Sequence, residues 1–183
     1  QYFDGLGRPL QTVKANITPD KSDLVTYHEY DAYGRETNVW LPSVATSNNG
    51  AFVSFGNIGG KALATYNGDM APYTKTVYEN SPLNRILEQY GPGQDWHNQG
   101  KAVRTAYLLN NNTYSCKLFT TSDNKLEVSI TRSADAPNYA DNELFVTRGT
   151  DEAGNISYEF KDKLGQTVLT RQMEGTEAHD TYY

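Results

Sequence analysis

The sequence contains a single cysteine, Cys116, among 183 residues. One thiol cannot form a disulfide within the chain, so no such crosslink is predicted. An isolated cysteine behaves in most folds as a small apolar residue of the core. We therefore predict that Cys116 is a buried packing residue rather than a reactive nucleophile.

Long apolar runs and concentrations of positive charge are also missing. Hydrophobic residues make up 37% of the chain, and no stretch is apolar for the ~20 residues that a membrane-spanning helix requires. The first residues have neither the charged start nor the apolar segment of a signal peptide. A formal net charge of −6 without a Lys/Arg run argues against a nucleic-acid partner. We predict no membrane span and no nucleic acid.

Motifs of catalysis are absent as well. No H-E-x-x-H, paired C-x-x-C, P-loop or G-x-S-x-G pattern occurs. The most enzyme-like cluster is Asp95-Trp96-His97, because an acid beside a histidine is able to tune a general base. On an extended chain, neighbouring residues point to opposite faces, so we interpret Trp96 as a structural anchor after a Gly-Pro-Gly break. The sequence predicts no catalytic residue, no cofactor and no metal ligand, and therefore a protein that is not an enzyme.

What the sequence does contain is a repeated turn among aromatic residues. It has 14 tyrosines, which favour β-strands with large wet faces. The clearest copy of the repeat runs from Tyr27 to Thr37. In this copy the Asp31 carboxylate is placed to accept a bond from a backbone N–H two residues on, and Gly34 provides the positive φ that the turn needs. Arg35 then begins the return strand.

Three other stretches repeat this pattern with changes. The first keeps the aspartate-to-glycine spacing, the second is longer and lacks the glycine, and the third has its aspartate one place later. In the longer copy we expect Asn84 at the left-handed position, which asparagine tolerates better than most residues. The motif residues of the four copies are Phe3, Asp4, Gly7, Arg8, Tyr30, Asp31, Gly34, Arg35, Tyr78, Asn84, Arg85, Phe160 and Gly165.

These repeats predict an all-β fold. We expect an antiparallel meander of β-hairpins that forms a twisted, partly open sheet with little helix. The whole of 1-183 is expected to be a single β domain and a piece of a longer repeat protein, because each end falls inside a hairpin unit. The predicted hairpin units span 1-13, 24-42, 73-90 and 144-173, with an insertion over 94-147.

Two regions between the hairpins carry separate predictions. Residues 43–60 are rich in Ser, Asn and Gly and indicate a loop, after which residues 61–66 are expected to form a short helix. In the insertion, Leu126, Val128 and Ile130 alternate with polar residues, so we expect one buried face on that strand.

Two sets of side chains carry binding hypotheses. Arg8, Arg35 and Arg85 begin return strands, where they either bind an acidic ligand or act as stacked or bidentate partners of Asp or Tyr in the adjoining hairpin. Trp40 and Trp96, together with Tyr33 and Tyr90, either pack on the sheet or stack against a carbohydrate. Burial of both tryptophans would exclude sugar stacking at these positions.

The repeated turn resembles a known family. Tyr30-Asp31-Ala32-Tyr33-Gly34-Arg35 is similar to the YD repeat of RHS proteins, whose signature is Tyr-Asp-x-x-Gly-Arg, and Phe3 to Arg8 is a close variant. Together with Tyr78 to Arg85 and Gly91 to Trp96, it looks like the uncharacterised domain that precedes the repeats in RHS proteins of Bacteroidetes. The resemblance covers nearly the whole chain.

This resemblance implies a function. It implies a non-catalytic structural segment of a secreted or cell-surface protein, contributing to a β-shell or its base that encloses a C-terminal toxin, as in polymorphic toxins. Its partners are then adjoining repeats of the same polypeptide, and an encapsulated C-terminal domain or a glycan. The alternative is a carbohydrate- or surface-partner-binding module that uses exposed aromatic residues.

Overall fold

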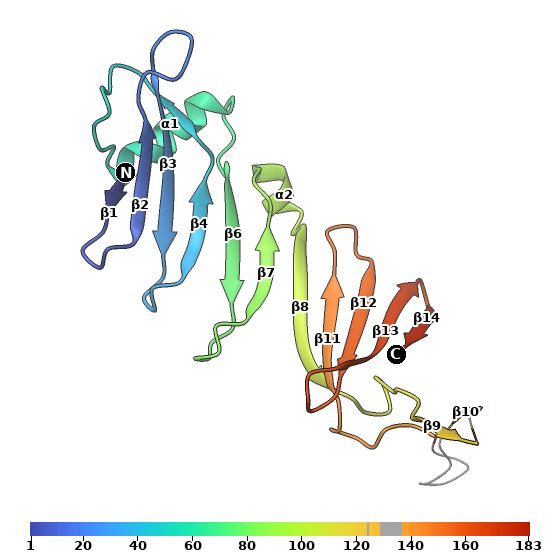
Figure 1. Cartoon of the computed structure of the whole chain (residues 1–183). Helices are drawn as coiled ribbons and strands as arrows, with labels where there is room; N and C mark the ends of the chain where they lie inside the picture. The colour runs from blue at the N-terminus through green and yellow to red at the C-terminus, as the bar shows by residue number, and fades with distance from the viewer. Residues whose placement is uncertain (124, 129–136) are drawn as a thin grey trace. The chain divides into compact units, whose positions relative to one another are not determined.

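The computed structural model describes residues 1–123, 125–128 and 137–183 (Figure 1). The chain divides into two compact units, Gln1–Val103 and Arg104–Tyr183. Antiparallel strands that follow one another as a meander dominate both units, and helix is scarce. The prediction of an all-β meander with little helix is confirmed, whereas a single domain over residues 1–183 stays a prediction.

The first unit is built from three consecutive hairpins. Within it the strands lie in the order β1-β2-β3-β4-β6-β7. The additional strand β5 pairs with residues 23–25 at the start of β3. The hairpins span residues 2–14, 23–40 and 73–90, against predicted bounds of 1-13, 24-42 and 73-90. The strands are β1 (Tyr2–Phe3), β2 (Pro9–Lys14), β3 (Asp23–Tyr30), β4 (Glu36–Trp40), β5 (Ser43–Ala45), β6 (Tyr73–Tyr78) and β7 (Ile86–Tyr90).

One face of this sheet carries the core of the first unit. Helix α1 (Phe55–Thr65) buries Ile58 and Ala62, which are one helical turn apart. Ile58 packs with Val25 and Tyr27 of β3, and Leu10, Val13 and Trp40 pack around them. The core therefore joins a helix to the central strand of the sheet.

The prediction of a loop over residues 43–60 and a helix over 61–66 is wrong at both ends of the loop, whereas residues 46–54 form no regular structure and residues 61–65 are helical. Residues 43–45 form β5, and α1 begins at Phe55. Three glycines in the first half of α1 disfavour a helix locally. Burial of Ile58 against the sheet outweighs that preference, because tertiary packing of an apolar face provides most of a helix's stability.

The second unit is a sheet in the order β8-β11-β12-β13-β14, with a separate pair of strands, β9 and β10. Its core contains Cys116, Leu144, Val146, Phe160 and Leu169. The strands are β8 (Ala102–Leu109), which starts at the end of the first unit, β9 (Phe119–Ser122), β10 (Lys125–Val128), β11 (Phe145–Thr150), β12 (Ile156–Lys161), β13 (Thr167–Glu174) and β14 (Glu177–Tyr182).

The strand β10 corrects one prediction. Leu126 was expected on a buried face but is 70% exposed, because β10 pairs only with β9 and the part of the chain that the structure describes places no core against it. Ile130, on the same predicted face, lies outside the described residues.

A second helix also differs from the prediction. Asp95, Trp96 and His97 were expected on an extended segment but lie in α2 (Gln94–Asn98). Gly93 precedes α2 with a φ of 123°, a conformation that glycine adopts without strain. None of the helices in the described parts of the chain is long and apolar enough to cross a membrane.

Candidate functional site

The turns between hairpin strands share one hydrogen-bond pattern. In the second hairpin the amides of Tyr33 and Arg35 both donate to one oxygen of Asp31, each over 2.9 Å. The amide of Gly34 donates to the Asp31 carbonyl, and the amide of Asp31 donates to the Arg35 carbonyl. Gly34 has a φ of 83°, in the left-handed region. One aspartate therefore organises the whole turn.

The same four bonds recur at three other aspartates. Turns that start at Asp4, Asp151 and Asp162 have corresponding donors two, three and four residues on. In all of these turns the residue three places after the aspartate is a glycine with positive φ. The turn is thus a repeated element of both units.

In the first unit an arginine completes the turn. Arg8 donates from Nε to the second oxygen of Asp4 over 2.7 Å, and Arg35 does the same with Asp31. The amide of Arg8 and its guanidinium, set against the opposing effect of burial, hold the pKa of Asp4 below its usual value. Asp31 is under the same opposing influences: burial raises its pKa, and hydrogen bonds from Arg35 outweigh that effect. Both carboxylates are therefore stable as anions.

Each of these arginines also contacts the next hairpin. The Cζ atom of Arg8 lies 4.2 Å from the ring centroid of Tyr30, and the hydroxyl of Tyr30 donates to the Pro9 carbonyl over 2.7 Å. Tyr30 ends β3, and Arg8 directly precedes β2, its neighbour in the sheet. We call this pair of interactions the arginine–tyrosine contact.

A second arginine–tyrosine contact links the second hairpin to the third. The Cζ atom of Arg35 lies 4.7 Å from the ring centroid of Tyr78, whose hydroxyl donates to the Glu36 carbonyl over 3.0 Å. Arg35 also donates from Nη1 to the Glu79 carbonyl over 3.0 Å. In both contacts the carbonyl that accepts from the tyrosine belongs to the residue after the arginine. The contact therefore has the same construction at two successive positions along the sheet.

The third turn also pairs an acidic residue with an arginine, but it uses different residues. Glu79 replaces the aspartate and forms a two-pronged ion pair with Arg85, with an Nη2 to Oε2 distance of 2.6 Å. The Arg85 guanidinium and the Ser81 hydroxyl lower the pKa of Glu79 to about 2. Asn84 has a φ of 56°, the left-handed conformation that the sequence predicts for it. The longer glutamate side chain spans the longer turn.

The turns of the second unit have no arginine in the equivalent place. Asn155 bonds to Asp151 through its side-chain amide over 2.7 Å, and Gln166 bonds to Asp162 only through its backbone. Phe160 is fully buried in the core, and Gly165 has a φ of 81°. Here the turn is retained without the arginine–tyrosine contact.

The two tryptophans lie in different surroundings. Trp40 packs against Tyr73, with 4.8 Å between ring centroids, and its indole N–H donates to Glu29. Trp96 is 40% exposed, and the Lys101 ammonium lies 5.5 Å from its ring centroid. The two tryptophans are not both buried, so sugar stacking stays a prediction.

The three histidines are occupied by local contacts. His28 lies with Nδ1 2.6 Å from Oε1 of Glu36. His97 lies with Nε2 2.8 Å from the Gly91 carbonyl and packs against the rings of Tyr73 and Tyr90. His179 lies 3.6 Å from Glu174 on the surface. Across the described ranges, no group of three or more His, Cys, Asp and Glu side chains is arranged to hold a metal ion.

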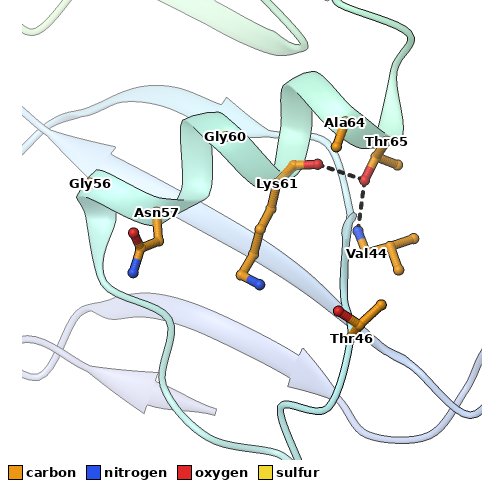
Figure 2. A pocket seen from close by; sticks show the side chains of 8 residues that line it. All are labelled: Val44, Thr46, Gly56, Asn57, Gly60, Lys61, Ala64 and Thr65. Carbon is orange, nitrogen blue, oxygen red and sulfur yellow. Dashed lines mark hydrogen bonds between the residues drawn. The ribbon is translucent and has the colours of Figure 1, made fainter.

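A groove in the first unit lies beside α1 (Figure 2). It has a volume of about 620 Å³, and its lining residues are Gly56, Asn57, Gly60, Lys61, Ala64 and Thr65 of α1 together with Val44 and Thr46. The Thr65 hydroxyl connects two sides of the groove, because it accepts from the Val44 amide over 2.9 Å and donates to the Lys61 carbonyl over 2.8 Å. Lys61 supplies the one charged side chain among the lining residues. The groove therefore offers little catalytic chemistry.

Sequence reasoning missed two buried polar residues that hold loops to the sheet. Gln11 forms a pair of hydrogen bonds with the backbone of Val53, over 2.7 and 2.8 Å. Asp23 accepts from the amides of Asn16 and Gly50 and from the Asn48 side chain. Partners up to 42 residues apart leave no local pattern. The one signal in the sequence that could have revealed them is a polar residue at a position where an alternating strand is expected to point into the core.

Together these features define an antiparallel β protein whose hairpins share one turn and, in its first unit, one arginine–tyrosine contact. Residues 1–109 match the profile of a family described as a domain of unknown function, DUF6443. The match covers more than half of the 183 residues, so the chain belongs to the DUF6443 family. A search of the curated proteins finds no match. The family description carries no activity, and the RHS resemblance stays a prediction.

Proposed function

We propose that this chain is a non-catalytic structural segment of an RHS/YD-repeat protein. In this proposal it forms part of a β-shell, or the base of one, in a secreted or cell-surface protein. The shell encloses a C-terminal toxic domain. The neighbouring partners of the segment are adjoining repeats of the same polypeptide.

The observation that carries this proposal is the arginine–tyrosine contact. It joins each of the first two hairpins to the next through a ring, a guanidinium and a backbone carbonyl. A guanidinium over a tyrosine contributes about 0.5–2 kcal/mol, depending on how far the pair is desolvated. A contact that connects one hairpin to the next suits a wall of successive hairpins.

Both arginines also form ion pairs within the molecule. Arg8 and Arg35 pair with Asp4 and Asp31, at 2.6 and 2.7 Å. An arginine that binds an acidic ligand needs a guanidinium edge that faces solvent, whereas these side chains are mostly covered. Of the two interpretations of these arginines, the arrangement favours the structural one.

The direct test is electron cryomicroscopy of the full-length gene product. We expect the hairpins of residues 1–183 to lie in a continuous β-wall that surrounds an internal space. A discrete domain, with no strands paired beyond its own hairpins, would contradict the proposal.

The proposed location has a separate test. Antibody detection of an epitope tag, after fractionation of the producing cells, is expected to find the protein outside the cytoplasm. Recovery of all of it from the cytoplasm would contradict a secreted or surface role.

A further inference from the structure

A cavity of the second unit lies beside the turn between β12 and β13. Its volume of about 340 Å³ is within the range of about 300–1,000 Å³ that is usual for ligand pockets. Asp162 begins this turn and lines the cavity, as does Leu164 at the tip of the turn, which is 84% exposed. The cavity is therefore open to solvent beside a copy of the repeated turn. The remaining walls include Leu118, Tyr139, Glu143 and Leu144.

The turn at this cavity differs from the other three aspartate turns in one hydrogen bond. In those turns the second carboxylate oxygen accepts from the side chain four residues on, which is Arg8, Arg35 or Asn155. Gln166 has this place in the turn of Asp162 and bonds to the aspartate only through its backbone. Among the residues that the structure describes, Oδ2 of Asp162 therefore has no hydrogen-bond partner. This turn keeps the acceptor of a guanidinium but lacks the guanidinium.

A tyrosine ring lies at the same cavity. Tyr139 is half-buried, and within the described ranges of the chain its hydroxyl has no hydrogen-bond partner. Burial raises the pKa of Tyr139, and the negative charges of Cys116, Asp162 and Glu143 raise it further, so both carboxylates act on this hydroxyl. The arginine–tyrosine contact of the first unit combines a carboxylate, a tyrosine ring and a guanidinium. Two of these three groups are present at the cavity.

The charges at the cavity favour a cation. Asp162 and Glu143 carry two negative charges and Lys163 carries the one positive charge among the lining residues, so a net negative charge remains. The Glu143 carboxylate is held at the cavity by the Ala140 amide, which donates to its Oε2 over 2.9 Å. A guanidinium pairs with a carboxylate through two parallel bonds and also stacks on an aromatic ring, whereas an ammonium is a compact point charge. A carboxylate beside a tyrosine ring therefore suits arginine better than lysine.

We propose that this cavity binds an arginine side chain of a peptide segment. The guanidinium pairs with Oδ2 of Asp162 and lies against the ring of Tyr139, and its methylene groups lie along Leu144 and Leu164. A residue within a polypeptide fits better than free arginine, because the net negative charge of the cavity repels an α-carboxylate. This role goes beyond the proposed structural function and does not depend on it.

The test is an NMR titration of the full 183-residue chain with the peptide acetyl-Gly-Arg-Gly-amide at neutral pH. We expect saturable shifts in the backbone amides of Leu164 and Gln166, which donate to Asp162, with a Kd on the order of 1 mM. The comparison ligands are the same peptide with lysine in place of arginine, and free L-arginine. Both are expected to bind more weakly than the arginine peptide.

Two variants remove the free carboxylate oxygen in different ways. D162N removes the charge, while the asparagine oxygen still accepts from the turn amides. Q166R places an arginine four residues after the aspartate, as Arg8 is placed after Asp4, so that Asp162 is paired within its own turn. Both variants are expected to weaken binding of the arginine peptide by at least about tenfold. Unchanged amide shifts in β11 show that each variant keeps its fold.

D151N is the matched control, because Asn155 already bonds to the second carboxylate oxygen of Asp151. We expect it to leave peptide binding unchanged. Four results would overturn the proposal: no saturable shift with the arginine peptide, equal or tighter binding of the lysine peptide or of free L-arginine, unchanged binding in D162N or Q166R, or an equal loss in D151N. None of these results bears on the structural role of the hairpins.

Discussion

Single residues carry the electrostatics of this protein, and Glu79 is the clearest case. Its carboxylate accepts from the Arg85 guanidinium and from the Ser81 hydroxyl, and these bonds lower its pKa from 4.5 to about 2. A carboxyl with a depressed pKa stabilises the folded state above its unfolded pKa. That contribution is lost as the pH falls through the folded pKa.

The first prediction therefore concerns E79Q. We expect this variant to have a lower Tm than the wild type at neutral pH. The difference is expected to shrink between about pH 4.5 and about pH 2, because Glu79 becomes protonated there. Thermal unfolding by circular dichroism across this pH range measures it. A difference that stays constant down to pH 2 would contradict the role of the charge.

Cys116 provides the second prediction. Burial raises the pKa of its thiol to about 11, and the side chain is 1% exposed. Because the thiolate is the reactive form, we expect a disulfide-exchange reagent at neutral pH to react at least about tenfold faster in urea than in buffer. Equal rates in the two conditions would contradict the buried position.

At the scale of the element, the turn depends on glycine for two reasons. Gly34 has a φ of 83°, and a Cβ at this position would lie 2.8 Å from Nη1 of Arg8. The first reason is backbone strain in the left-handed region. The second and smaller reason is that a Cβ would displace the end of the flexible Arg8 side chain.

The third prediction follows from these two facts. We expect G34A to lower the free energy of unfolding by at least about 1–2 kcal/mol. G5A is the control, since Gly5 lies outside the left-handed region and a Cβ added there would meet no heavy atom within 4 Å, so its effect is expected within about 0.5 kcal/mol. Urea unfolding of both variants measures the difference. Similar values for the two would show that the turn tolerates a side chain.

The elements also show which features a sequence alone reveals. Asp31, Gly34 and Arg35 lie within five residues and act on each other, so their pattern is visible along the chain. The start of helix α1 was predicted too late because its glycines disfavour a helix locally, whereas Ile58 in its first half packs on β3. Local chemistry was predictable, whereas structure that depends on distant partners was not.

The candidate site follows the same division. The sequence identified the turn residues and offered both interpretations of the arginines. It did not reveal that the hydroxyls of Tyr30 and Tyr78 reach carbonyls 21 and 42 residues away.

At the scale of the whole molecule, each unit depends on its own core. In the second unit Phe160 is fully buried among Cys116, Leu144, Val146 and Leu169. A buried phenylalanine replaced by alanine loses its transfer free energy and leaves a cavity. The second unit therefore depends on this one ring more than on its exposed aromatic residues.

The fourth prediction tests this dependence. We expect F160A to destabilise the second unit by about 3–5 kcal/mol. F145A is the control, because Phe145 is 58% exposed and its loss is expected to cost less than about 1 kcal/mol. Hydrogen exchange of β11, β12 and β13 measures both. Unchanged protection of these strands in F160A would contradict the assigned core.

The arginine–tyrosine contact joins one hairpin of the first unit to the next. A double-mutant cycle with R35M and Y78L tests it most directly, with R35M and Y33L as the matched cycle, because Tyr33 lies near the same guanidinium but is 77% exposed. We predict a coupling of about 1 kcal/mol or more for Arg35 with Tyr78, and less than about 0.5 kcal/mol for Arg35 with Tyr33. Additive effects within about 0.3 kcal/mol for Arg35 and Tyr78 would contradict the account.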